Sequence, residues 1–183
     1  MKASLITALI CAFSLTAALA QEYVSPTKSP ETGKSPGVKV KLISQNDRVK
    51  TYAVIFAKGD EVVSGLAEFA EKYKVTSARF TGIGDATSAK VGWFDKSRSQ
   101  FKVIPITTPG EITSLVGDIA TYQGKPVVHG HLAVATEDGI VHGGHLLQAY
   151  IFPTLEVIVT VEEKPLYKRL DPETGATVID ANQ

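Results

Sequence analysis

The chain has 183 residues, and its 19 basic and 19 acidic side chains give a formal net charge of zero at pH 7. Proteins that bind nucleic acid usually carry a strongly basic face or stripe, and this balance of charge gives no sign of one. The length and the 44% of hydrophobic residues suffice for a single domain with a substantial core.

Residues 1–20 have the pattern of a secretory signal peptide. Lys2 gives a positive start, a long apolar stretch follows, and an A-x-A cleavage site ends at Ala20. Cleavage there would remove Cys11, the only cysteine, so the mature chain would contain no disulfide bond and carry a formal charge of −1. We therefore expect an exported protein, periplasmic or extracellular, with no transmembrane segment after cleavage.

Residues 21–38 contain several Ser-Pro pairs and scattered charges, with few apolar side chains. Because prolines favour extended backbone and the segment has little to bury, we expect a disordered linker without a chemical role. The folded domain is expected over residues 39–183.

The domain is predicted to begin with two strands and a helix. Residues 38–42 alternate as an exposed-face strand does, and residues 50–56 are typical of a more buried one. A helix is expected after Gly59, with Asp60 as its cap and Glu61 favourable to its dipole. Apolar side chains recur at helical spacing at Val62, Leu66, Phe69, Ala70 and Tyr73.

The rest of the chain is rich in short apolar runs separated by Gly and Asp turns. These runs predict strands at residues 77–81, 89–94, 99–107, 111–120, 127–135, 140–152 and 155–161, and a final short strand at 176–179. One early helix and many short strands indicate a single α+β domain. We expect a mainly antiparallel sheet of about seven strands with one principal helix.

Glu111 is the acidic side chain that we select as a candidate catalytic base. Asp85 and Asp118 also lie in or beside apolar runs, where carboxylates are more often turn, edge or interface groups. Glu111 would act as a base, or support a metal ligand, if the fold brought it near the histidines described next. The run 82–84 (Gly-Ile-Gly) lacks the third glycine of a dinucleotide-binding loop, so no nucleotide site is expected.

All four histidines lie between residues 129 and 145, in two pairs separated by a turn. Residues 136–139 read Thr-Glu-Asp-Gly, which predicts a hairpin whose three-residue loop ends in a left-handed glycine. If the two residues that close this turn face each other, His131 lies directly opposite His145. Directly opposed residues have Cβ atoms about 4.5–5.5 Å apart.

Three of these histidines are predicted to converge on one face of the hairpin. His129 and His131 are one residue apart, so on a strand both rings leave the same side, and His145 joins them from the opposite strand. His142 points to the other face by simple alternation, unless a glycine bulge at 143–144 intervenes. The candidate metal ligands are therefore His129, His131 and His145.

Three imidazoles without a cysteine would leave a coordination position open, as catalytic or exchangeable zinc sites do. Iron, nickel and copper also accept imidazole, so the pattern predicts zinc or another divalent transition metal without fixing its identity. The alternative is that the histidines are surface, interface or pH-sensitive packing groups that hold no metal.

Four pieces of sequence, in this order, resemble the plants-and-prokaryotes-conserved (PPC) domain of the free-standing bacterial type. They are FTGIG at 80–84, EITSLVG at 111–117, HGHL at 129–132 and GGHL at 143–146. The resemblance covers about residues 50–162. It implies an antiparallel-sheet α/β fold that assembles as a homotrimer. It also implies a metal site, generally taken as zinc, on His129, His131 and His145.

The same resemblance brings an association with DNA, because plant members are joined to AT-hooks that bind A/T-rich DNA. This chain has no Arg-Gly-Arg core of an AT-hook, is neutral overall and carries an export signal, so nucleic acid is not an expected partner. Pro109 and Gly110 stand where plant members have Arg-Phe, which argues against plant-type partner recognition.

Three functions remain, in this order of preference. The first is an exported homotrimer with a three-histidine metal site. If it is an enzyme, it would be a metal-dependent hydrolase or lyase acting on a small molecule that the sequence does not identify. The second is a non-catalytic module for partner binding or assembly. The third is the DNA-binding function associated with the family.

Overall fold

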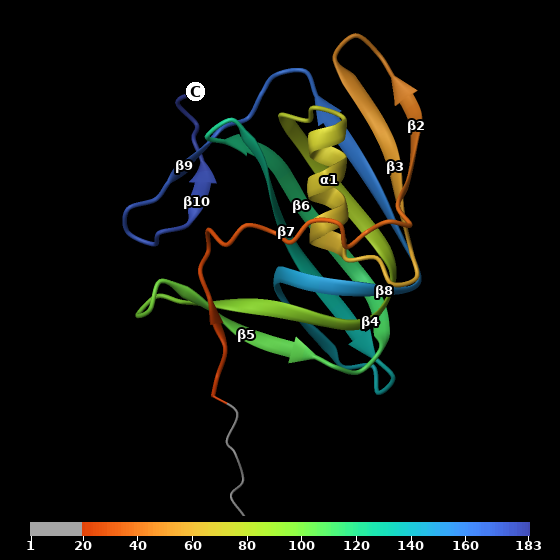
Figure 1. Cartoon of the computed structure of the whole chain (residues 1–183), viewed down its shortest axis with the longest axis vertical. Helices are drawn as coiled ribbons and strands as arrows, with labels where there is room; N and C mark the ends of the chain where they lie inside the picture. Colours follow the sequence, from red (N-terminus) through yellow and green to blue (C-terminus); the bar gives the residue numbers. More distant parts are fainter. Residues whose placement is uncertain (1–19) are drawn as a thin grey trace, which may run out of the picture.

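The computed structural model describes residues 20–183, so the expected signal peptide lies, except for its last residue, outside the described residues. The elements in chain order are β1 (Tyr23–Val24), β2 (Lys39–Gln45), β3 (Val49–Ala57), α1 (Val62–Lys72), β4 (Ser77–Asp95), β5 (Gln100–Ile106), β6 (Gly110–Tyr122), β7 (Lys125–Thr136), β8 (Val141–Glu162), β9 (Lys168–Leu170) and β10 (Thr177–Ile179). Figure 1 shows their arrangement. Among residues 20–183, no helix is long and apolar enough to cross a membrane.

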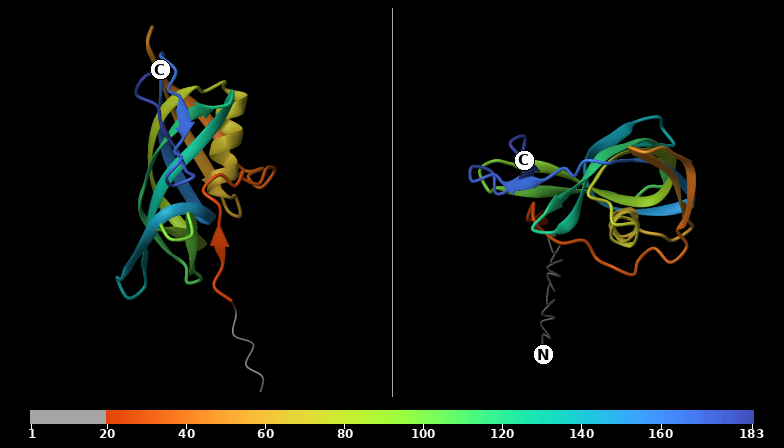
Figure 2. Two further views of the ribbon diagram at one scale, coloured as in Figure 1. Left: turned by 90° about the vertical axis from the view of Figure 1, so that its left-hand side faces the viewer. Right: turned by 90° about the horizontal axis from the view of Figure 1, so that it is seen from above.

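Eight strands form one antiparallel sheet in the order β1-β5-β4-β6-β7-β8-β3-β2. β4 also pairs with β8, from Ala78 opposite Val161 to Gly92 opposite His145, so β4, β6, β7 and β8 close into a ring. The right-hand view of Figure 2 looks down this ring, with α1 along one side. β9 and β10 form a separate two-stranded hairpin.

The mainly antiparallel sheet and the single principal helix agree with the sequence-based prediction, but the strands are divided differently. The predicted strands at 77–81 and 89–94 are one continuous β4, and those at 140–152 and 155–161 are one continuous β8. Shifts of register between Gly84 and Val91 interrupt the pairing of β4 with β8, but neither strand ends there. The main sheet has eight strands where about seven were expected, since β1 comes from the expected linker.

The core fills the space between α1 and the inward face of the ring. The predicted helical face is buried at Val62, Leu66, Phe69 and Ala70, whereas Tyr73 at the end of the helix is 37% exposed. The largest side chains that are fully buried come from both layers: Leu66 from α1, and Phe56, Ile112, Leu115, Ile119, Ile151 and Leu155 from the sheet. Burial of such side chains contributes about 1.5–3 kcal/mol each and fixes α1 against the sheet.

Glu61, and not Asp60, caps α1. The buried Glu61 carboxylate accepts hydrogen bonds from the amides of Val63 (3.0 Å) and Ser64 (2.7 Å). It also accepts one from the amide of Ala149 in β8 at 3.1 Å, which ties the helix start to the ring. Burial raises the pKa of Glu61 above its usual value, against the opposing effect of these three hydrogen bonds.

The segment 21–38 packs on the domain, contrary to the expected disordered linker. β1 pairs with β5, and the buried hydroxyl of Ser35 donates to the backbone carbonyl of Glu61. Asp60 accepts a hydrogen bond from the amide of Gly37 at 2.8 Å, which explains why its carboxylate is not available as the helix cap. The polar groups of this segment thus order it by bonding to the start of α1.

We expect Glu61→Ala to lower the free energy of unfolding by about 2–4 kcal/mol, because three amides lose their acceptor. Glu71→Ala is the matched control, since Glu71 is exposed on the same helix, and should change stability by less than about 0.5 kcal/mol. Urea denaturation followed by circular dichroism measures both. Equal stability of the two variants would contradict the capping role.

Candidate metal centre

The β7–β8 hairpin has the predicted register. The Thr136 amide donates to the Ile140 carbonyl at 3.0 Å, and the loop ends in a left-handed glycine, Gly139, with φ of +76°. His131 lies opposite His145, as predicted. The pairing continues to Val141 without a shift, so the glycines at 143–144 do not bulge against β7.

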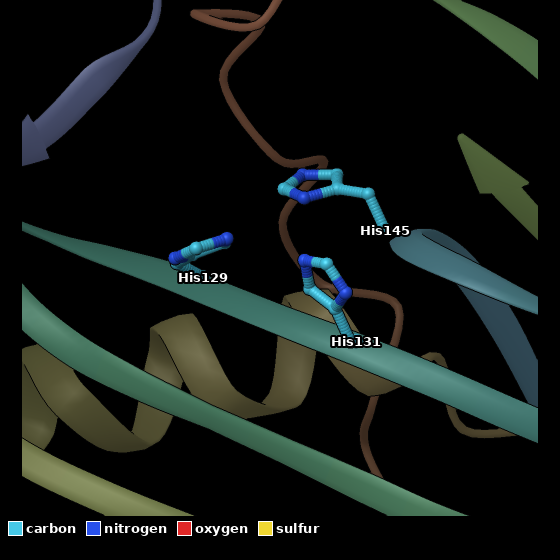
Figure 3. Close-up of side chains that lie close together, drawn as sticks. All are labelled: His129, His131 and His145. Atoms are coloured by element: carbon cyan, nitrogen blue, oxygen red, sulfur yellow. The ribbon is translucent and has the colours of Figure 1, made fainter. Parts of the chain in front are cut away.

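The structure brings His129, His131 and His145 together on the outward face of the sheet. Figure 3 shows their rings turned toward one shared space, with α1 behind β7 on the other side. One ring nitrogen from each lies within 4.8 Å of those of the other two. Zn–N bonds of about 2.0–2.1 Å place ligand nitrogens about 3.4 Å apart, so modest side-chain rotations would bring the rings to coordinating distance.

His142 is not part of this cluster. It pairs with Val134, which is only 1% exposed and faces the core side of the hairpin, whereas His131 and His145 alternate to the outward side. This agrees with the alternation argument from the sequence.

Asp118, and not Glu111, is the carboxylate beside the histidines. On β6 it lies opposite His129, and its Oδ2 is 3.2 Å from His129 Nδ1. Its Oδ1 is 3.0 Å from Nζ of Lys168, whose side chain is only 1% exposed. Burial alone would raise the pKa of Asp118, but the hydrogen bonds and charges of His129 and Lys168 outweigh it and lower this pKa.

Glu111 lies at the other end of β6. It pairs with Asp85 of β4. Glu111 is five positions along β6 from Val116, the residue opposite His131, and this separation is about 16 Å at about 3.3 Å per residue. The charge of Asp85 raises the pKa of Glu111 above its usual value. Glu111 lines a separate surface pocket of about 350 Å³. The condition for a role of Glu111 at the histidines, that the fold bring it near them, is therefore not met.

The ring of His145 stacks on Phe101 of β5, with centroids 4.1 Å apart and ring planes 11° from parallel. Burial, and then the neighbouring His129, His131 and Lys168, lower the pKa of His145 to about 4. Burial and His129 likewise lower the pKa of His131. Both imidazoles are therefore neutral at pH 7, which is the form that donates a lone pair to a metal.

Gly117 and Gly130 allow β6 and β7 to approach beneath the histidines. They lie opposite each other, and the ring of Phe80 packs against both from the core side. A Cβ at Gly117 would overlap the carbonyl of His129 and this ring, whereas one at Gly130 would lie 3.2 Å from the ring. The glycine between His129 and His131 thus faces the core and lets the Phe80 ring pack there.

We expect Gly117→Ala to destabilise the protein by about 1–3 kcal/mol, because the added methyl group must push β7 away from β6. Gly130→Ala should cost less, since its contacts are looser. Urea denaturation of both variants measures the difference. A Gly117→Ala variant as stable as the wild type would show that β6 and β7 are not packed this closely.

Residues 43–163 match the model of the Plants and Prokaryotes Conserved (PCC) domain, the PPC domain that the motifs resemble. The chain belongs to the PCC-domain family. No curated protein matches its sequence.

Solved structures share the PCC fold. A PPC protein from Pyrococcus horikoshii has a TM-score of 0.70 at 26% identity, over 78% of this chain and 99% of the other. A protein from Ralstonia eutropha JMP134, described as a candidate DNA-binding protein, has a TM-score of 0.67 at 33% identity, over 70% and 90% of the two chains. A protein from Archaeoglobus fulgidus, described as metal-containing, has a TM-score of 0.66 at 26% identity, over 78% and 97%.

The residues that surround the three histidines are not predicted from the sequence. Asp118 was assigned to turns, edges or interfaces, and Phe101 and Lys168 were not selected at all. The pairing of Asp118 with His129 follows from the tight turn at Gln123 and Gly124, because the β6–β7 register runs without a shift from Tyr122 opposite Lys125 to Ser114 opposite Ala133. That turn is the signal that could have found Asp118. β9, which carries Lys168, lies outside the residues that match the family.

Proposed function

We propose that this PCC-domain protein is an exported protein that binds one divalent transition metal ion, with zinc as first choice, through His129, His131 and His145. The observation that carries the proposal is the convergence of three imidazole nitrogens on one point of the outer sheet face. The metal-containing relative from Archaeoglobus fulgidus supports it. Export rests on the signal-peptide pattern of residues 1–20.

The donor set fits zinc. Three imidazoles with a carboxylate behind one of them form the arrangement in which a second group orients a metal ligand. A metal held by three protein ligands keeps a position for a substrate and would supply Lewis-acid polarisation for a hydrolase or lyase reaction on a small molecule. The side chain of His129 is 43% exposed, so a ligand can reach the cluster from solvent.

The proposal includes the homotrimer that the family resemblance implies. The outer sheet face carries exposed apolar side chains that a second copy would cover, with exposed fractions of 63% for Ile83, 47% for Val116 and 40% for Ile158. Ile158 and Val116 both lie opposite Thr81 of β4, and Val116 in turn lies opposite His131. The histidines therefore border this apolar face.

The proposal predicts about one equivalent of zinc or another transition metal per chain in the mature protein, residues 21–183, purified without a histidine tag. The His129→Ala/His131→Ala variant should contain none, because one imidazole cannot hold the ion alone. His142→Ala is the matched control and should keep the metal, since it lies on the other face. Elemental analysis after incubation with zinc and dialysis measures all three. Absence of metal from the wild type would refute the site.

A second candidate function, DNA binding, is favoured by the description of the Ralstonia eutropha relative. The equal numbers of acidic and basic residues oppose it. We expect duplex DNA to bind no tighter than the non-specific range of about 10⁻⁴–10⁻⁶ M at physiological salt. Fluorescence anisotropy with an A/T-rich duplex tests this. Tighter binding that weakens steeply with added salt would favour the DNA-binding function instead.

A further inference from the structure

Lys168 is the most unusual charged residue near the histidines. Its side chain is 1% exposed, and a lysine this buried needs a charged partner, because an unpaired ammonium would lose its hydration without compensation. The partner is Asp118 Oδ1 at 3.0 Å. Lys168 begins β9, which follows the last residue that matches the PCC domain.

The chain just before Lys168 is fixed to the ring by backbone hydrogen bonds. The Thr121 amide of β6 donates to the Leu166 carbonyl at 2.7 Å, and the Leu166 amide donates to the Thr76 carbonyl at 3.2 Å. A parallel bridge joins Thr121 to Tyr167. These bonds place Tyr167, and with it Lys168, beside the C-terminal end of β6, where Thr121 lies three residues from Asp118.

The two oxygens of the Asp118 carboxylate are held differently: Oδ1 forms an ion pair with Lys168 Nζ at 3.0 Å without hydrogen-bond geometry, and Oδ2 is hydrogen-bonded to His129 Nδ1. With both oxygens restrained, the carboxylate cannot rotate freely, and this fixes the direction in which it accepts a hydrogen bond from His129. When a carboxylate accepts from Nδ1–H, the imidazole is held in the tautomer whose Nε2 carries the lone pair. For His129 this lone pair is the one free to face the cluster.

We propose that Lys168 is a positioning residue for the three-histidine site: it holds the Asp118 carboxylate so that His129 presents the Nε2 lone pair. The inference rests on the proposed metal-binding function but concerns a residue outside the coordinating set. The charge of Lys168 also lowers the pKa of His145, but it is the smallest of the causes, after burial, His129 and His131.

The first test is the tautomer of His129 in the metal-free mature protein, read from long-range ¹H–¹⁵N spectra at neutral pH. We expect wild-type His129 to carry its proton on Nδ1, and Lys168→Met to shift it to a mixture of tautomers. Arg169→Met is the matched control, because Arg169 follows Lys168 on β9, is half exposed and lies toward Asp171. It should leave the spectrum of His129 unchanged. A mixed or Nε2–H tautomer in the wild type would overturn the inference.

The second test is zinc affinity, measured by competition with a chelator. We expect about 10-fold weaker binding by Lys168→Met, at the lower end of the effect of groups that orient metal ligands, and no change by Arg169→Met. Zinc binding by Lys168→Met as tight as or tighter than that of the wild type would overturn the positioning role. If the wild-type protein bound no zinc, the proposed function would be refuted. The tautomer of His129, which is measured in metal-free protein, would still test the positioning role of Lys168.

If Lys168→Met does not fold, the double variant Lys168→Met/Asp118→Asn replaces it. Removing both members of a buried ion pair together avoids leaving one charge without its partner. We expect this variant to fold and to show His129 as a mixture of tautomers, since the carboxamide is neutral and no longer held. A pure Nδ1–H tautomer with unchanged zinc affinity would overturn the inference.

Discussion

The pairing of β4 with β8 is the constraint on which the rest of the structure depends. It joins two long strands over most of their length and closes the ring β4-β6-β7-β8. Because the ring is closed, β7 must span from β6 to the first half of β8, and this brings Asp118 opposite His129 and His145 opposite His131. Gly144 lies where β4 and β8 approach closely: a Cβ there would be 2.8 Å from the carbonyl of Gly92.

The histidine cluster could be predicted from the sequence because it depends on short-range rules. A turn of known type sets the register of one hairpin, and the alternation of a strand decides which rings share a face. Alternation alone places His145 on the face of His131 and His142 on the other face, and both placements agree with the structure. The same rules identified the apolar face of α1, which depends only on helical periodicity.

The surroundings of the cluster could not be predicted in this way, because they depend on pairings between distant strands. Phe101 of β5 and Lys168 of β9 come from such strands. Asp118 differs, because it meets His129 across the β6–β7 hairpin in a register that runs unshifted from the turn at Gln123 and Gly124, a local signal that the strand predictions did not use. Composition alone predicts a disordered linker at residues 21–38, whereas this segment packs on the domain. The polar groups that suggested disorder, such as Ser35, are the groups that bond to the buried start of α1.

Segments from both terminal regions of the domain lie next to residues that surround the histidines. At the N-terminal end, Val24 of β1 pairs with Phe101, whose ring stacks on His145. At the C-terminal end, Lys168 holds the carboxylate beside His129. Terminal segments accept truncation, extension and substitution more readily than the middle of a domain. A lineage with this architecture can therefore alter the surroundings of an inherited histidine cluster by changing its tails, while the histidines and the fold that carries them stay the same.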